Sequence, residues 1–206
     1  LQGSMYFVEL NENTPVVDGV YQLSTASQLV LFSNCVNGGK GALDAVLTAD
    51  IELTEAEMPA PIGTEDNPYK GWFDGQGNTI SGFVFDDVEA NNVGFFGYIS
   101  GADIVRVLLK NAKVVGHNNA GGLVGGTVSG TLENIYVEGS VTADGMKADS
   151  NLANFGAGLL CGRIQSGAKI NNVIVELTDI TDGLYLATAF GKLNQAGATE
   201  ESVFTN

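Results

Sequence analysis

The stretch "AGGLVGGTVSGTLENIYVEGSV", residues 120–141, combines frequent glycines with aliphatic side chains at regular intervals. A flexible linker would also be rich in glycine, but it would lack the periodic aliphatic residues because it has no core to supply. Within "IYVEGSV" the aliphatic residues alternate with other residues, which is the period of a strand with one buried face. We therefore predict that the stretch is structured, with strands separated by turns in which glycine avoids a steric penalty.

The same pattern occurs before and after this stretch. The sequence "VGFFGYISGADIVRVLLKNAKV" (93–114) aligns with it at a spacing of 28 residues, so that Ile104 corresponds to Leu132 and Leu109 to Val137. A third copy, residues 157–180, aligns "INNVIVE" with "LENIYVE", and a decayed fourth copy follows it. Repeats of this length without a helical period indicate a solenoid of short strands and turns, in which the terminal repeats are usually atypical.

The N-terminal part has a different period, which predicts a helix over about residues 26–36. Thr25 and Gln28 have the spacing of a capping box, and Leu29, Phe32 and Val36 follow at helical intervals. Such a helix would cover the open end of the strand core and prevent pairing at an exposed sheet edge. We expect one domain over residues 6–206 with repeats at about 93–116, 120–143, 157–181 and 186–206, and we interpret residues 1–5, "LQGSM", as a tag or cloning scar.

The charge balance excludes two classes of partner. The 206 residues contain 9 Lys and Arg against 24 Asp and Glu, a net charge of −15, which repels nucleic acid and anionic lipid surfaces. No apolar run approaches the roughly 20 residues of a membrane span, so no membrane insertion is expected in this segment. No signal peptide is recognisable, and we expect that an export signal has been lost from this sequence. Cys35 and Cys161 are expected to be buried thiols, since neither has metal-ligand spacing around it.

Several of these stretches together resemble the GLUG-motif proteins, which are bacterial secreted and cell-surface proteins with adhesin-like repeats. The resemblance runs from Tyr21 to about Val175, through "YQLSTASQLVLFSNCVNGG", "VLTADIEL", "FDGQGNTISGF" and the two repeat stretches quoted above. The glycine-leucine-any-glycine element matches residues 122–125, whereas Phe95 replaces its leucine in one copy and Cys161 replaces its second glycine in another. The resemblance implies a right-handed parallel β-helix displayed outside the cell as a module of a longer chain. With the capping helix, the predicted fold class is therefore an all-β right-handed parallel β-helix.

Residues with catalytic or metal-binding chemistry are few. His117 lies in the polar stretch "VVGHNNAGG" with no cysteine nearby and no serine placed for a triad, and we interpret it as a solvated loop residue. Asp74 with Glu65, Asp66 and Asn67 could offer oxygen ligands to calcium, but glycine turns explain the same letters, and calcium binding by these acidic loops stays open. The adjacent pairs Asp86–Asp87 and Glu200–Glu201 are poorly arranged for glycoside hydrolysis, because neighbours along a strand point to opposite faces. Arg106 is interpreted as a corner residue stacked on Asn134 and Asn172 of the later copies. We expect no catalytic residue, metal or cofactor.

The alternation of the strands predicts an outward surface. If the six residues that follow the repeat at alternate positions point inward (Val107, Leu109, Ile135, Val137, Val173 and Val175), then Leu108, Tyr136 and Ile174 point outward in one column. Lys110, Glu138 and Glu176 are expected to form a second column beside it. A row of exposed apolar groups favours a contact face, and the alternative is that an inserted loop at residues 144–155 covers it.

We accordingly predict a non-catalytic, secreted or cell-surface, adhesin-like module that is part of a longer chain. Its two columns would contact a host or microbial glycan or surface protein. One alternative is a structural spacer of a larger surface protein, and a further one is a polysaccharide-active enzyme.

Overall fold

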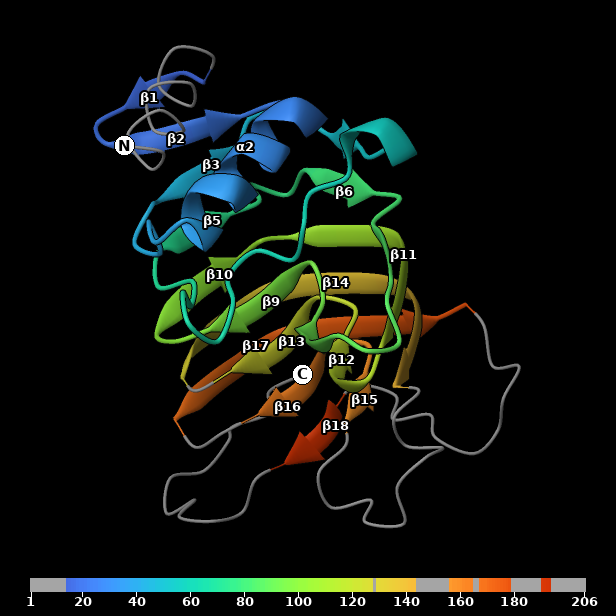
Figure 1. Ribbon diagram of the computed structural model, residues 1–206. Coiled ribbons are helices and arrows are strands. Elements are labelled where there is room, and N and C mark those ends of the chain that lie inside the picture. The colour runs from blue at the N-terminus through green and yellow to red at the C-terminus, as the bar shows by residue number, and fades with distance from the viewer. Residues whose placement is uncertain (1–13, 128, 144–155, 165–166, 179–189, 194–206) are drawn as a thin grey trace.

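A computed structural model describes residues 14–127, 129–143, 156–164, 167–178 and 190–193 (Figure 1). Within these residues strands predominate, with one α-helix, α2 (Ala26–Asn37), and one 3-10 helix, η1 (Glu55–Glu57). The first strands are β1 (Val16–Val17), β2 (Val20–Leu23), β3 (Ala45–Leu47), β4 (Ile51–Glu52), β5 (Trp72–Asp74), β6 (Thr79–Ser81), β7 (Val84–Asp86), β8 (Asn91–Val93) and β9 (Phe96–Ile99). The later strands are β10 (Ala102–Val105), β11 (Leu108–Gly116), β12 (Asn118–Gly121), β13 (Val124–Thr127), β14 (Gly130–Ala143), β15 (Ala157–Gly158), β16 (Cys161–Ile164), β17 (Ala168–Leu177) and β18 (Phe190–Leu193).

These strands form three sheets. The largest has 11 strands in the order β1-β2-β3-β5-β10-β14-β11-β6-β4, with β17 paired to β14 and β7 paired to β11 as branches. A three-stranded sheet has the order β15-β12-β8, and a four-stranded sheet has the order β18-β16-β13-β9. Strands β1 and β2 are antiparallel, and the other pairs of described strands are parallel.

The predicted all-β right-handed parallel β-helix with a capping helix is therefore wrong as the fold class. The described strands form mixed sheets, because β1 runs antiparallel to β2 and the 11-stranded sheet is branched. The repeat specifies which later strands are neighbours, but the residues before it follow no such spacing. Their short strands join the repeat strands at two places, β5 on β10 and β6 on β11, and this merges the strands into one large sheet.

The alignment of the repeat copies is confirmed by the strand register. Ile104 pairs with Leu132 and Leu108 with Tyr136, both at the predicted spacing of 28 residues. Tyr136 pairs in turn with Ile174 of the third copy. The strands β11, β14 and β17 consequently lie one beside the next (Figure 1). The decayed fourth copy contributes β18, whose Phe190 pairs with Cys161 of β16.

Helix α2 occupies almost the predicted range. The Thr25 hydroxyl accepts a hydrogen bond from the Gln28 amide at 3.3 Å, while Gln28 Oε1 accepts one from the Ser24 amide at 2.7 Å, so both unpaired amides at the helix start are satisfied. The predicted apolar face is buried, and Phe32 packs at its centre against the rings of Tyr69 and Phe73. No helix in the described part of the chain is both long and apolar enough to cross a bilayer.

The core is a continuous set of aliphatic and aromatic side chains contributed by the repeat strands and α2. Of the residues predicted to point inward, four are buried: Val107, Leu109, Ile135 and Val137. Their counterparts on β17, Val173 and Val175, are only partly buried against this core. Cys35 on α2 and Cys161 on β16 are buried, as predicted.

Candidate functional site

The predicted outward column lies across β11, β14 and β17. Leu108, Tyr136 and Ile174 are direct neighbours in the strand register. Ile174 is 56% exposed, whereas Leu108 and Tyr136 are half-buried. The alternation within each strand thus places all three on the face opposite the core.

Tyr136 lies between two carboxylates. Its hydroxyl is 3.0 Å from Glu138 Oε2 on its own strand and 2.8 Å from Glu176 Oε2 on β17, where Glu138 and Glu176 pair in register. Because a phenol carries one proton, the two carboxylates share it. The hydrogen bond to Glu176 is the main cause that raises the pKa of Tyr136, followed by desolvation and the bond to Glu138. The phenol therefore stays neutral and holds the two carboxylates together.

Lys110 reaches the same group by a different route from the one predicted. The register between β11 and β14 shifts between Leu109 and Ala112, and Asn111 within this bulge has a φ of 52°. Lys110 therefore does not stand in a regular column with Glu138. Its Nζ lies over the Tyr136 ring, 5.7 Å from the centroid, in a cation–π contact. We call Leu108, Lys110, Tyr136, Glu138, Ile174 and Glu176 the Tyr136 cluster.

The Tyr136 cluster is suited to recognition. It presents carboxylate oxygens whose positions are fixed by one hydroxyl, an ammonium group and an exposed aliphatic side chain on adjacent strands. Carboxylates arranged in this way accept hydrogen bonds from sugar hydroxyls or from a basic side chain. The cluster brings together all six residues that the sequence singled out.

The carboxylates considered for calcium do not come together. Asp74 on β5 is 1% exposed and is paired with Arg106, which leaves it unavailable to solvent ions. Glu65 and Asp66 lie instead on the segment between η1 and β5, where they line a separate pocket with residues of β8. Within the described residues no group of three His, Cys, Asp or Glu side chains is arranged to hold a metal ion.

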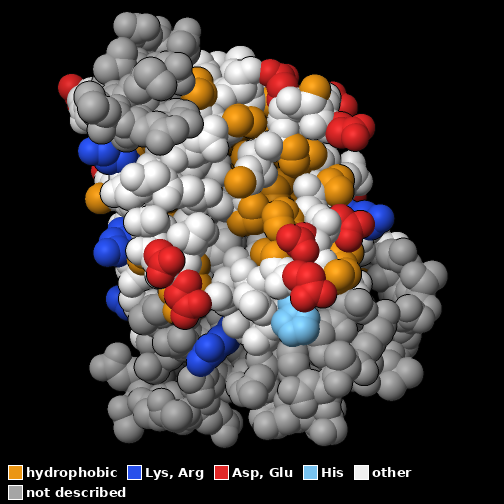
Figure 2. Space-filling view, viewed as in Figure 1, with side chains coloured by type: hydrophobic (Ala, Val, Ile, Leu, Met, Phe, Trp, Pro, Cys, Tyr) orange, Lys and Arg blue, Asp and Glu red, His pale blue; other side chains and the backbone are white. Residues whose placement is uncertain are grey.

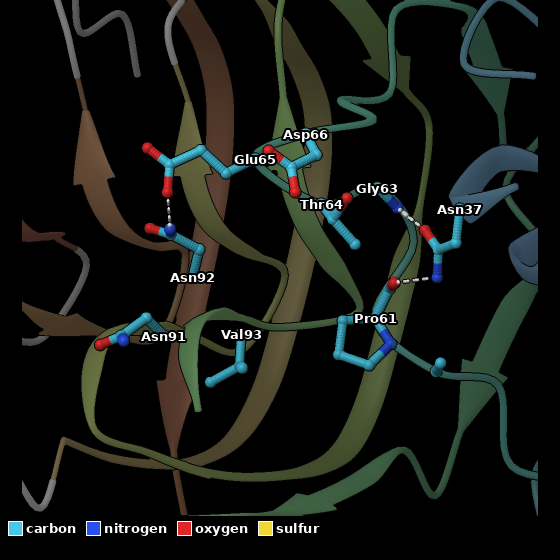
Figure 3. Close-up of a pocket in the computed structure, with 10 residues that line it drawn as sticks. Asn37, Pro61, Gly63, Thr64, Glu65, Asp66, Asn91, Asn92 and Val93 are labelled. Atoms are coloured by element: carbon cyan, nitrogen blue, oxygen red, sulfur yellow. Dashed lines mark hydrogen bonds between the residues drawn. The ribbon is translucent and has the colours of Figure 1, made fainter. Parts of the chain in front are cut away.

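That pocket, of about 380 Å³, is a polar hollow that the sequence did not predict (Figure 3). Asn37 at the end of α2 fixes one wall, because its side chain accepts from the Gly63 amide at 2.8 Å and donates to the Pro61 carbonyl at 3.0 Å. On the opposite side Asn92 donates to Glu65 Oε2 at 3.4 Å (Figure 3). The pocket is lined by Asn37, Ala60, Pro61, Gly63, Thr64, Glu65, Asp66, Asn91, Asn92 and Val93.

A sequence signal for this wall existed in the repeat. Asn92 and Asn119 occupy equivalent positions of two copies, both at positive φ, and Asn119 donates to Asn92 Oδ1 at 2.8 Å. Asparagine tolerates this left-handed conformation better than most residues do. An asparagine ladder beside a turn was therefore the recognisable pattern.

The other residues weighed for catalysis are dispersed. His117 is half-buried between β11 and β12, and its amide donates to the Ala90 carbonyl at 2.7 Å. Asp86 and Asp87 are exposed at the end of β7. Glu200, Glu201 and the loop at residues 144–155, which was expected to be able to cover the outward column, lie outside the described residues.

Comparison with known proteins gives two partial matches. The chain is 37% identical over 106 residues to Halomucin of Haloquadratum walsbyi, a match that covers 50% of this chain and 1% of that protein. It is 31% identical over 126 residues to a protein of Evansella cellulosilytica described as a Gly-rich membrane protein, covering 57% of this chain and 14% of that protein. The chain thus spans a small share of each relative. No family model and no solved structure matches it.

Proposed function

We propose that this chain is a non-catalytic, adhesin-like module of a secreted or cell-surface protein, and that its Tyr136 cluster contacts a glycan or another protein. The observation that carries this proposal is the sharing of the Tyr136 hydroxyl between Glu138 and Glu176, which lie on neighbouring strands. Side chains held in place before binding lose less entropy when a ligand arrives, so such a cluster favours recognition.

The surface location is supported by the relatives and by the motif. One relative is named a mucin and the other a membrane protein, and both are far longer than the stretch that this chain matches. The resemblance to GLUG-motif proteins, through Gly122-Leu123-Val124-Gly125 and its two altered copies, favours the same location. We therefore propose that the chain is one module of a longer surface protein.

The non-catalytic character is supported by the chemistry of the cluster. Its phenol has a raised pKa, with the hydrogen bond to Glu176 as the largest cause, and a phenol that stays protonated is a poor general base at neutral pH. The cluster contains no serine, cysteine or histidine that could act as a nucleophile or base. Release of reducing sugar from polysaccharides by the wild-type chain would contradict this part of the proposal.

The contact role is tested by Tyr136→Phe, which removes the hydroxyl and keeps the ring, and by Glu176→Gln. Both variants should keep the melting temperature near that of the wild type while weakening binding to ligands found on a glycan array or a surface-protein array. The expected loss is about tenfold, the usual effect of removing a hydrogen bond to a charged group. Glu133→Gln, elsewhere on β14, is the matched control and should bind as the wild type does.

The spacer alternative is favoured by one observation, the small share of each relative that the chain covers. It predicts that the folded wild-type chain binds nothing on either array. Wild-type binding by both Tyr136→Phe and Glu176→Gln would remove the cluster from the proposal, whereas a large loss of stability in both would make it a structural feature.

A further inference from the structure

Strand β7 has an outer edge on which no described strand pairs. On its inner side β7 pairs with β11, where the Lys113 amide donates to the Phe83 carbonyl at 2.8 Å and the Asp87 amide donates to the Val115 carbonyl at 3.2 Å. Since peptide groups alternate in direction along a strand in a parallel ladder, the N–H and C=O groups of Val84 and Asp86 point away from β11. The outer edge of β7 therefore offers backbone donors and acceptors to an additional strand.

One of these donors has only a weak partner. The Val84 amide lies 3.4 Å from the thioether sulfur of Met58. A thioether is a poor hydrogen-bond acceptor, so exchanging it for a carbonyl of an incoming strand is favourable.

The edge exists because the chain leaves the strand path one layer earlier. Strand β4 pairs with β6, and the Leu53 amide still donates to the Ser81 carbonyl at 2.8 Å. The chain then turns into η1 at Glu55–Glu57 and does not continue as a strand beside β7. The position next to β7 that a further strand would fill is consequently left open.

A cavity occupies that position. It measures about 470 Å³ and is lined by Leu53, Glu55, Met58, Gly82 and Val84. Apolar side chains continue outside it, since Val84 is 45% exposed and Val88 is 42% exposed. Figure 2 shows hydrophobic side chains gathered across the middle of this face. A cavity of this size can accept one large aliphatic or aromatic side chain.

The charge around the cavity selects the partner. Exposed acidic side chains flank it on both η1 and the β7 segment: Glu55, Glu57, Asp86, Asp87 and Glu89. The whole chain carries a net charge of −15, so a second copy docking edge to edge would bring like charges together. A segment carrying Lys or Arg is attracted to the same position.

We propose that the outer edge of β7 and the adjoining cavity bind an extended basic segment of another protein by strand addition. Its backbone pairs with the Val84 and Asp86 peptide groups, a large apolar side chain enters the cavity between Leu53 and Met58, and flanking Lys or Arg residues face the acidic side chains. Main-chain pairing supplies affinity and the cavity supplies specificity in this mode of recognition. The site is separate from the Tyr136 cluster and does not depend on the function proposed for that cluster.

The probe is a synthetic peptide in which lysine and valine alternate around a central phenylalanine. Its binding to the whole chain is measured by fluorescence anisotropy at low and high salt. The peptide should bind and weaken as salt rises, whereas a peptide with glutamate in place of lysine should not bind. The decisive variant is Asp86→Pro, because proline removes an outward amide without breaking a ladder bond to β11. Its matched control is Asp86→Asn, which removes the charge and keeps the amide.

Asp86→Pro should weaken peptide binding about tenfold more than Asp86→Asn does. Equal binding by the two variants would mean that the peptide is held by charge alone and would overturn the proposal. If Asp86→Pro does not fold, peptides N-methylated on one edge replace it: methylation of the edge that meets β7 should abolish binding and methylation of the other edge should not. Equal effects of the two methylations would overturn strand addition. A wild-type dimer that Asp86→Pro dissociates would identify a second copy as the occupant and would overturn the basic partner.

Discussion

Arg106 forms a bidentate ion pair with Asp74, a carboxylate whose side chain is only 1% exposed although the side chain of Arg106 is 54% exposed. Nε donates to Oδ1 at 2.9 Å, and Nη2 donates to Oδ2. The hydrogen bond to Asp74 is the main cause that raises the pKa of the guanidinium group. Arg106 has a φ of 53°, like Asn134 and Asn172 at the equivalent positions of later copies, where Asn172 donates to Asn134 Oδ1 at 2.7 Å. The sequence predicted a corner residue, and the structure adds that its side chain neutralises a buried carboxylate.

Arg106→Asn should lower the melting temperature, because the asparagine keeps the left-handed corner but leaves Asp74 buried without a charged partner. Thermal unfolding followed by circular dichroism measures the change. The double variant Asp74→Asn with Arg106→Asn should recover part of the lost stability, since no buried charge remains. Additive losses in the two single variants and the double variant would show that the pair is not coupled.

Phe32→Ala should lower the free energy of unfolding by about 3–5 kcal/mol, because a fully buried ring is removed from its contacts with Tyr69 and Phe73. It should also promote association by uncovering apolar surface and strand edges beneath α2. Urea denaturation and sedimentation measure the two effects. Asn34→Ala, at an exposed position of the same helix, should change stability by less than about 0.5 kcal/mol. A monomeric Phe32→Ala variant of unchanged stability would show that α2 does not contribute to the core.

Gly125→Ala should lower the free energy of unfolding by about 1–3 kcal/mol through overpacking. A methyl group at this position would meet the backbone of Asn92 and Val93 in the preceding copy, which cannot move as a side chain can. The measurement is again urea denaturation. Gly38→Ala is the comparison, since it follows α2 and would meet the Asn34 carbonyl at the milder distance of 3.1 Å. An equal loss in both variants would contradict the role assigned to close approach between the copies.

Stability should fall between about pH 8.5 and pH 10 through Cys161. Burial raises the pKa of its thiol to about 12, against about 8.5 in an unfolded chain. The folded pKa is the higher one, so this contribution to stability is complete below the unfolded pKa and is lost as pH rises toward the folded pKa. Cys161→Ala should flatten the decline in melting temperature over this pH range. An identical pH dependence in the variant and the wild type would mean that other groups cause the decline.

The sequence by itself determined the local elements and the order in which the later ones pair. The capping residues and apolar spacing of α2 act within one or two helical turns, so they could be recognised from the letters alone. The spacing of 28 residues likewise predicted that Leu108 lies beside Tyr136, and alternation predicted that Ile135 and Val137 face the core. These features depend on interactions between residues that are close in the chain or equivalent in the repeat.

The tertiary structure alone decided how the sheets merge and which polar groups meet. The residues before the repeat carry no spacing that predicts β5 on β10, β6 on β11 or an open edge at β7, because strand pairing between unlike segments depends on loop paths and on competition for the same edges. The bulge at Asn111 turned Lys110 toward the ring of Tyr136, and Arg106 reached back 32 positions to the carboxylate of Asp74. Such contacts form between side chains of adjacent layers, and their geometry is fixed only after the strands have packed.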